Sequence, residues 1–241
     1  MLTMSASSHP PHQPLGEIVV DWQEPPFPAR EVMHGRLCRL EPLDVSKHAE
    51  QLFAANALDS HGANWTYLPY GPFESFAEYR AWLEQQSSTR DPLFFAIVDT
   101  ASGDAIGVAS YLRITPSSGS IEVGHLHFSP KLQRKPAATE AMFLMMRHAF
   151  ELGYRRYEWK CNALNKSSRQ AALRLGFSFE GIFRQATVSK GRNRDSAWYA
   201  AIDKEWPALR EAFEQWLSPS NFDEKGKQCV GLSLLTRPIL K

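Results

Sequence analysis

The order in which strand patterns and helix patterns follow one another restricts this chain to a mixed α/β sheet. Alternation of apolar and polar residues predicts strands, and apolar residues three and four positions apart predict helices. The predicted strands cover 35–43, 92–99, 105–114, 119–128, 155–163, 177–188 and 195–202. The predicted helices cover 44–58, 75–86, 136–152 and 167–175, and a last one starts near Lys204. Because helices interrupt the strands along the whole chain, we expect a single α/β domain.

The two ends of the chain differ from this patterned region. Residues 1–33 contain "HPPHQP" and "EPPFPAR", which favour an extended, proline-rich N-terminal arm. Residues 34–217 carry the strand and helix patterns and form the predicted domain. Residues 218–241 are polar at first and then apolar, and we expect this C-terminal extension to pack back onto the domain.

Composition argues against several classes of protein. The 27 basic and 26 acidic side chains give a net charge of +1, so no overall charge attracts nucleic acid or an anionic membrane. No apolar run reaches the length of a membrane span, and the first residues do not resemble a signal peptide. The three widely spaced cysteines, Cys38, Cys161 and Cys229, match neither a disulfide framework nor a zinc site. We therefore expect a cytoplasmic protein with reduced thiols and no metal.

The stretch "LQRKPAATEAM" has the features of a phosphate-binding helix start. Pro136 suits the first position of a helix, where an N–H is not needed. The free N–H groups and the dipole of a helix start attract anions. Ala137 and Ala138 would let a phosphate approach the backbone, and Arg134 and Lys135 add positive charge. An ordinary amphipathic helix that begins with proline is the alternative interpretation.

A second helix start occupies an equivalent place after the next predicted strand. In "NKSSRQAALRLGF", Asn165 and Ser168 precede the helix and Gly176 ends it. Asn165 can serve as a helix cap and Gly176 as a left-handed terminator, which would explain both residues without a ligand.

Taken together and in order, these motifs resemble the GNAT superfamily of acetyl-CoA-dependent N-acetyltransferases, and within it the Rim-type branch that acetylates the N-termini of ribosomal proteins. Gln133–Ala138 is similar to the superfamily's pyrophosphate loop, and Thr139–Ala141 to the "TEA" that follows it in the Rim-type branch. Glu122–Gly124 matches the "E-I/V-G" strand, and Asn165–Phe177 matches the later Asn-x-x-Ser helix with its Gly-Phe end. The likeness spans roughly residues 34–206. It implies an α+β fold with a mixed, mostly antiparallel central sheet flanked by helices.

The resemblance also implies a set of contacts with acetyl-CoA as the co-substrate. The residues implied to bind it are His127, Phe128, Gln133, Arg134, Lys135, Ala137, Ala138, Thr139, Asn165 and Ser168. Two positions depart from the superfamily pattern. Pro136 replaces a glycine and removes one donor, and Ala172 stands where many members have a tyrosine that protonates the leaving thiolate. Ser168 is therefore the better candidate for that role.

Transfer of an acetyl group to an amine requires a proton acceptor, a donor for the oxyanion and help for the thiolate. Glu122 is our first choice of base because it lies on the central strand, and His125 and His127 are alternatives. Each of them could equally be a solvated strand residue. The resemblance assigns the oxyanion donor to the backbone near His127 and Phe128. Cys161 alternates with aromatic residues and has no histidine nearby in sequence, which favours a buried thiol over a covalent nucleophile.

The aromatic loop "NWTYLPYGPF" borders the acceptor pocket in the resemblance. Trp65, Tyr67 and Tyr70, with His125, are the predicted substrate-binding residues, although simple packing of a long loop would explain the aromatic side chains as well. We expect an N-acetyltransferase acting on a primary amine, either a protein N-terminus or a small molecule. The alternative is a catalytically weak acyl-CoA-binding protein with a regulatory role. Neither activity requires nucleic acid or a membrane, and the sequence leaves open whether the chain forms a homodimer.

Overall fold

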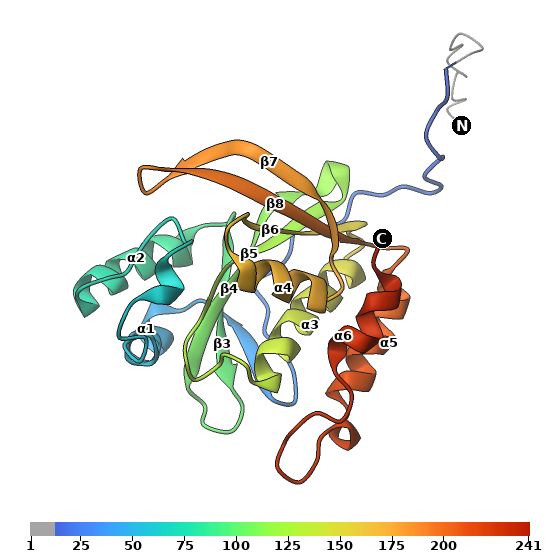
Figure 1. Ribbon diagram of the computed structural model, residues 1–241. Coiled ribbons are helices and arrows are strands. Elements are labelled where there is room, and N and C mark those ends of the chain that lie inside the picture. Colours follow the sequence, from blue (N-terminus) through green and yellow to red (C-terminus); the bar gives the residue numbers. More distant parts are fainter. Residues whose placement is uncertain (1–12) are drawn as a thin grey trace.

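An eight-stranded sheet with the strand order β1-β2-β3-β4-β5-β6-β8-β7 forms the centre of the computed structural model, which describes residues 13–241 (Figure 1). All neighbouring strands pair antiparallel except β5 and β6, which are parallel. The strands are β1 (Met33–His34), β2 (Cys38–Pro42), β3 (Leu93–Asp99), β4 (Ala105–Thr115), β5 (Ser120–Phe128), β6 (Arg156–Asn162), β7 (Ser178–Ser189) and β8 (Arg192–Ile202). The expected mixed, mostly antiparallel sheet in a single domain is confirmed.

Helices cover both faces of this sheet. They are α1 (Val45–Asn56), α2 (Phe76–Ser88), α3 (Pro136–Glu151), α4 (Lys166–Arg174), α5 (Trp206–Leu217) and α6 (Leu232–Thr236). Strand β3 shows the two layers, because Phe95 packs into the core under α3 and α5 whereas its neighbour Phe94 packs into the core under α1 and α2. Both side chains are fully buried, so β3 lies between two hydrophobic layers.

The long helix α3 begins and ends where the sequence predicts, to within one residue. Pro136 occupies its first turn, and Gly153 follows it with φ +95°, a conformation that glycine adopts without strain. Glu140 in this helix is buried, although its side chain is acidic. Its carboxylate accepts hydrogen bonds from the N–H groups of Arg36, Leu37 and Cys38 at 3.0, 2.6 and 2.8 Å. This contact joins the start of α3 to the turn between β1 and β2.

Strands β5 and β6 are paired over only part of their length. Their register runs from Ser120 opposite Arg156 to Val123 opposite Trp159, and then the pairing ends. Strand β5 nevertheless continues to Phe128 and β6 to Asn162. A bulge in β5 lies at this point, because Ser110 pairs with Gly124 but Val108 pairs with His127. The two strands therefore separate in the middle of the sheet.

Both end segments of the chain contact the expected domain. The predicted arm, 1–33, falls partly outside the described residues, which begin at residue 13. Within it, the Tyr154 hydroxyl donates to the carbonyl of Pro26 at 3.3 Å. The C-terminal extension packs beside α4, as expected: the Thr236 hydroxyl donates to the carbonyl of Arg174 at 3.0 Å, and Leu232 is fully buried.

Candidate active site

Two cavities meet at Trp159, beside the point where β5 and β6 separate. One, of about 600 Å³, is bounded by the β7–β8 hairpin, β5 and the loop before α2, and we call it the hairpin cavity. The other, of about 630 Å³, lies between the starts of α3 and α4 and the loop after α5, and we call it the helix groove. Trp159 lines both cavities, so its side chain lies between the helix groove and the hairpin cavity.

Four basic side chains line the helix groove, and none of its described lining residues is acidic. Arg134 and Lys135 stand at the start of α3, Arg174 at the end of α4, and Lys227 in the loop after α5. Burial lowers the pKa of Arg174, but a guanidinium remains charged at neutral pH. Its Nη1 also donates to Thr139 Oγ1 at 3.0 Å, which fixes the two helices to each other. The groove is therefore suited to a ligand with several negative charges.

The start of α3 has the form that the sequence predicts for an anion site. Arg134 has φ +60° and turns the chain sharply into the helix. Lys135 is the N-cap, and its side chain makes no capping hydrogen bond, so it does not occupy the helix start. Ala138 lines the groove, whereas Ala137 is buried and its carbonyl accepts from Cys38 Sγ at 3.4 Å. No side chain caps the N–H groups of this first turn.

The start of α4 combines a cap with a hydroxyl in the hairpin cavity. Asn165 Oδ1 accepts from the N–H of Ser168 at 3.1 Å, so the predicted cap is confirmed, and Gly176 ends the helix with φ +86°. Ser168 Oγ accepts from Trp159 Nε1 at 3.0 Å. This bond uses the oxygen of Ser168 as an acceptor and leaves its O–H available to donate. Asn165 and Ser168 both line the hairpin cavity rather than the helix groove.

Gln133 supports the site from outside. Its Nε2 donates to Asn64 Oδ1 and to the carbonyl of Phe128, both at 2.8 Å, and Asn64 Nδ2 donates to the same carbonyl at 3.3 Å. The side chain of Gln133 therefore holds the end of β5 and lines neither cavity. Phe128, by contrast, lines the helix groove, so this bond fixes the strand end beside the separated strands.

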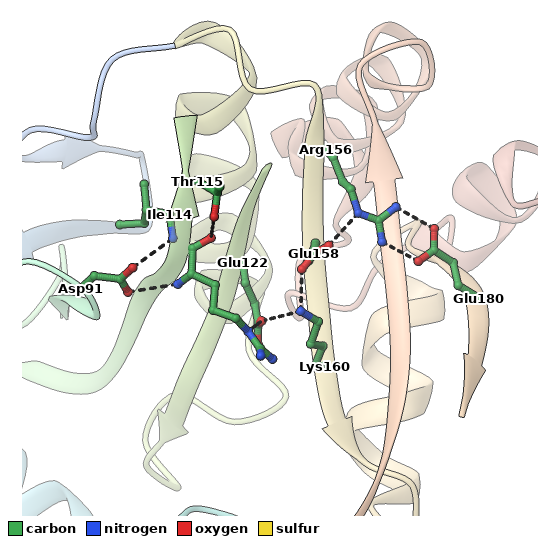
Figure 2. A network of polar contacts seen from close by, with 9 residues as sticks. Asp91, Ile114, Thr115, Glu122, Arg156, Glu158, Lys160 and Glu180 are labelled. Carbon is green, nitrogen blue, oxygen red and sulfur yellow. Dashed lines mark hydrogen bonds and ion pairs between the residues drawn. The ribbon is translucent and has the colours of Figure 1, made fainter. Parts of the chain in front are cut away.

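Glu122, the first choice of base, is buried between two cations. Arg113 Nε lies 2.7 Å from its carboxylate and Lys160 Nζ 3.2 Å away. Figure 2 shows Lys160 between Glu122 on β5 and Glu158 on β6, with Nζ 2.6 Å from the second carboxylate. The side chains of Glu122 and Lys160 are each only 5% exposed. The carboxylate of Glu122 is therefore held in ion pairs with both cations.

The two histidines of β5 have separate surroundings. His125 lines the hairpin cavity, and its Nδ1 lies 3.0 Å from the hydroxyl of Tyr70. His127 lines neither cavity, because its ring stacks on Trp65 at a centroid distance of 3.8 Å and is 2% exposed. Burial lowers the pKa of each to about 4, so both are neutral at neutral pH. Of the two, only His125 is placed to meet an acceptor.

The aromatic loop divides into a buried part and a lining part. Trp65 is 5% exposed at the centre of an aromatic cluster, with Phe73 at a centroid distance of 5.4 Å and Tyr79 at 6.5 Å. Trp65 therefore supports the loop by packing and lines neither cavity. Tyr70 reaches the hairpin cavity only through His125, whereas Tyr67 lines it directly.

The tip of the β7–β8 hairpin closes over the aromatic loop. Lys190 Nζ donates to the carbonyl of Trp65 at 2.9 Å and to that of Gly71 at 2.7 Å. The hairpin, coloured orange in Figure 1, extends across the molecule toward α2, in agreement with these bonds. Lys190 thus connects two segments that are far apart in the sequence, one on each side of the hairpin cavity.

Cys161 lines the hairpin cavity, but its surroundings do not activate it. Burial raises the pKa of the thiol, although Ser168 and Arg169 act in the opposite direction. The thiol is therefore protonated at neutral pH, as expected for a buried cysteine. Within residues 13–241, no three or more His, Cys, Asp or Glu side chains gather as a metal site would need, and no helix has the length and apolar character of a bilayer span.

Several lining residues were not predicted from the sequence. Arg174 lies within the Asn165–Phe177 motif but is not one of its matching positions, and Lys227 comes from a segment that carries no family motif. Lys160 and Arg194 lie on strands β6 and β8, where nothing in the sequence marks them as cavity residues. The alternation of β6 did place Lys160 on the polar face, opposite Trp159 and Cys161. No signal in the sequence shows that the loop after α5 reaches the helix groove.

Comparisons with known proteins agree with this geometry. A family model described as "Acetyltransferase (GNAT) domain" matches residues 38–178. The "Ribosomal-protein-serine acetyltransferase" of Escherichia coli (strain K12) is 33% identical over 100 residues, which are 41% of this chain and 55% of that protein. The chain therefore spans about half the length of this curated relative.

Solved structures resemble the chain over most of its length. A GCN5-related N-acetyltransferase from Brucella melitensis is 48% identical, with a TM-score of 0.88 over 90% of this chain and 99% of that chain. A probable acetyltransferase (GNAT family) from Chromobacterium violaceum ATCC 12472 is 40% identical, with a TM-score of 0.76 over 83% of this chain and 100% of that chain. Since the family model covers more than half of the 241 residues, the chain belongs to the GNAT acetyltransferase family.

Proposed function

We propose that this protein transfers the acetyl group of acetyl-CoA to a primary amine by direct attack while both substrates are bound. The observation that carries the proposal is the helix groove, in which four basic side chains surround an uncapped helix start. A pyrophosphate and a further phosphate, as in coenzyme A, match such a set of charges. Acetyl-CoA supplies the activated acetyl group, and the amine enters from the hairpin cavity.

The residues present fit coenzyme A in spite of the departure at Pro136. Proline at the first helical position removes an N–H, and no side chain caps the N–H groups that follow, although that of Ala138 donates to the carbonyl of Lys135 at 3.1 Å. Ala138 keeps the approach to these groups open, and Arg134, Arg174 and Lys227 lie around them. We assign the phosphates to this end of the groove, and Trp159 and Phe128 to the passage that leads between β5 and β6.

The hairpin cavity favours an amine in its neutral, nucleophilic form. Arg194 lines it outside the ion pairs that Glu122 makes with Arg113 and Lys160, and a like charge lowers the pKa of a bound ammonium group. An α-amino group has a reference pKa of about 7.7–8.0, so a modest decrease already leaves it neutral near pH 7. A strong base is then not required. His125, which is neutral and lines the cavity, is our choice to receive the proton. Glu122 holds Arg113 and Lys160 in place through its ion pairs.

The leaving sulfur is assigned to Ser168. Its hydroxyl accepts from Trp159 Nε1, so the O–H can donate into the hairpin cavity where the thiolate would form. A serine hydroxyl is too weak an acid to give up its proton fully, and a hydrogen bond to the sulfur is the contribution that we expect.

The acceptor belongs to the class of primary amines that includes protein N-termini. The curated relative from Escherichia coli is named for acetylation of a ribosomal-protein serine, which supports a protein N-terminus as the acceptor here. A peptide N-terminus is also the longer and more extended of the two options. The aromatic loop and the β7–β8 hairpin flank the hairpin cavity as two walls of suitable length.

Replacement of Ala138 by glutamate tests the cofactor site. The carboxylate would place bulk and negative charge at the helix start, and we expect the affinity for coenzyme A, measured by calorimetry, to fall by at least about tenfold. Ala81→Glu makes the same change at an exposed position of α2 and serves as the control. Unchanged affinity in a folded Ala138→Glu protein would place the phosphates elsewhere.

Turnover is measured separately, as release of free thiol from acetyl-CoA with a panel of amines. Thiol release that depends on the amine supports the transferase. Tight coenzyme A binding without release by any amine would instead favour the catalytically weak acyl-CoA-binding protein.

A further inference from the structure

The polar side chains beneath the β7–β8 hairpin form a chain of ion pairs with no excess charge. Arg113 contacts Glu122, and Glu122 contacts Lys160 at 3.2 Å. Lys160 then contacts Glu158 at 2.6 Å. The chain continues through Arg156, 2.6 Å from Glu158, and ends at Glu180, as Figure 2 shows. Three cations alternate with three anions, so the network neutralises itself.

Arg194 lines the same cavity but stands outside this network. Its Nε is buried and has no hydrogen-bond partner among the described residues, and no ion pair of residues 13–241 includes it. The neighbouring carboxylate is not available to it. Asp195 Oδ1 accepts from the N–H of Gln185 at 2.7 Å and from Asn193 Nδ2 at 3.0 Å, within the hairpin.

Strand alternation explains why Arg194 faces the cavity. Ala197 and Tyr199 of β8 are buried in the core under α3, so the intervening residues face the other side of the sheet. Ser196 and Trp198 line the hairpin cavity from that side, and Arg194 precedes them in the same register. The position of the guanidinium is therefore set by the strand.

No other group in the cavity compensates this charge. His125 is neutral, because its burial, and to a lesser degree the positive charge of Arg194, lower its pKa to about 4. Glu122 is already shared by Arg113 and Lys160. A guanidinium whose Nε is removed from water and left unpaired is costly, and such a group is stabilised when an anion binds.

We infer that Arg194 is the anchor for a carboxylate of the acceptor, so that the preferred substrate is a primary amine that carries an acidic group close to the amine. A guanidinium binds a carboxylate through two parallel hydrogen bonds, which would also orient the acceptor. The anion is a part of the acceptor, because the phosphates of coenzyme A have four cations of their own in the helix groove. The carboxylate can be an acidic side chain near a peptide N-terminus or the α-carboxylate of a free amino acid.

This inference rests on the proposed function and is tested on the full chain with paired acceptors. Ser-Glu-Ala amide and Ser-Gln-Ala amide differ only in one charge, and free glutamate and its α-amide differ only in the α-carboxylate. We expect wild type to favour the acidic member of one pair, and Arg194→Gln to reduce that preference in kcat/KM by about tenfold to a hundredfold, as for loss of a charged hydrogen bond. Which pair responds distinguishes the peptide from the amino acid.

Arg192→Gln is the matched control, since it removes the same charge from the same strand at an exposed residue that does not line the cavity. This variant should retain the wild-type preference. Equal kcat/KM for both members of each pair in wild type, or an equal preference in Arg194→Gln and wild type, would overturn the inference while thiol release still supported the transferase.

Calorimetry with the N-acetylated forms of the same compounds measures binding at the Arg194 site independently of acetyl transfer. If no amine supports thiol release, the proposed function fails, and this binding measurement still decides the anion site. Weaker binding of the acidic N-acetylated compound to Arg194→Gln than to wild type supports it, and equal binding refutes it.

Discussion

Removal of the Ser168 hydroxyl should separate two roles that the structure assigns to one atom. Ser168 Oγ accepts from Trp159 Nε1 at 3.0 Å, and its O–H is free to donate toward a thiolate in the hairpin cavity. Ser168→Ala therefore leaves an indole N–H without its partner, which costs about 1 kcal/mol at a half-buried site. For a protein of this size that cost corresponds to a decrease of about 2–4 °C in Tm.

The effect on turnover should be larger than the effect on stability. Loss of one donor to a developing charge should lower kcat by about 10²-fold, while KM for acetyl-CoA should change little because the proposed phosphate site lies in the other cavity. Ser168→Thr keeps a hydroxyl and should recover part of the rate. Ser87→Ala, which removes a hydroxyl from α2, is the control.

The two roles can be separated by removing the indole donor as well. In a Trp159→Phe background the N–H is absent, so Ser168→Ala should cost little further stability but should still reduce kcat. The assays are steady-state thiol release and a thermal melt on the same preparations. A Ser168→Ala protein that melts early but turns over within about twofold of wild type, well short of the usual general-acid effect, would remove Ser168 from the mechanism.

Two further predictions concern the hairpin and the histidines. Lys190→Met removes two hydrogen bonds to the aromatic loop, so amide hydrogen exchange in the hairpin tip should accelerate about fivefold or more, and KM for the acceptor should rise. Lys47→Met, on α1, is the control. An unchanged exchange rate in Lys190→Met would show that other contacts hold the tip. Burial lowers the pKa of His127 to about 4, below its unfolded value, so the unfolded state binds more protons between pH 4 and 6.5 and the folded state loses stability as the pH falls through this range. His127→Phe should remove about 2–3 kcal/mol of that loss between pH 7.5 and pH 4.5 in urea titrations, and parallel stability curves for the two proteins would contradict it.

Local signals in the sequence predicted the elements that build the site. Pro136 marked the start of α3, and Asn165 and Gly176 marked the two ends of α4, where Asn165 Oδ1 accepts from the N–H of Ser168. These signals act within a few residues, so they are visible in a single sequence. The family motifs then assigned residues at the starts of α3 and α4 to one cofactor site.

What the sequence could not show are contacts between distant segments. Arg174 and Lys227 meet at the helix groove only because the chain after α5 returns to α4. Lys190 meets the loop at Trp65 only after the hairpin has crossed the hairpin cavity. The sequence placed Trp65 among the substrate-binding residues, and it could not show that this side chain is buried. In a loop, the spacing of aromatic residues does not distinguish buried side chains from exposed ones.

The bond from Glu140 to the turn between β1 and β2 has a consequence for how the protein opens. The three N–H groups that this carboxylate accepts from lie 102–104 residues earlier in the chain. The first turns of α3 and the edge of the sheet are thus closed by one long-range contact, and neither can fray while the other stays native. The amides of the helix start should therefore exchange only through large, cooperative unfolding events, unlike those of most exposed helix ends. The helix groove is in this way protected from local breathing by a single side chain that does not line it.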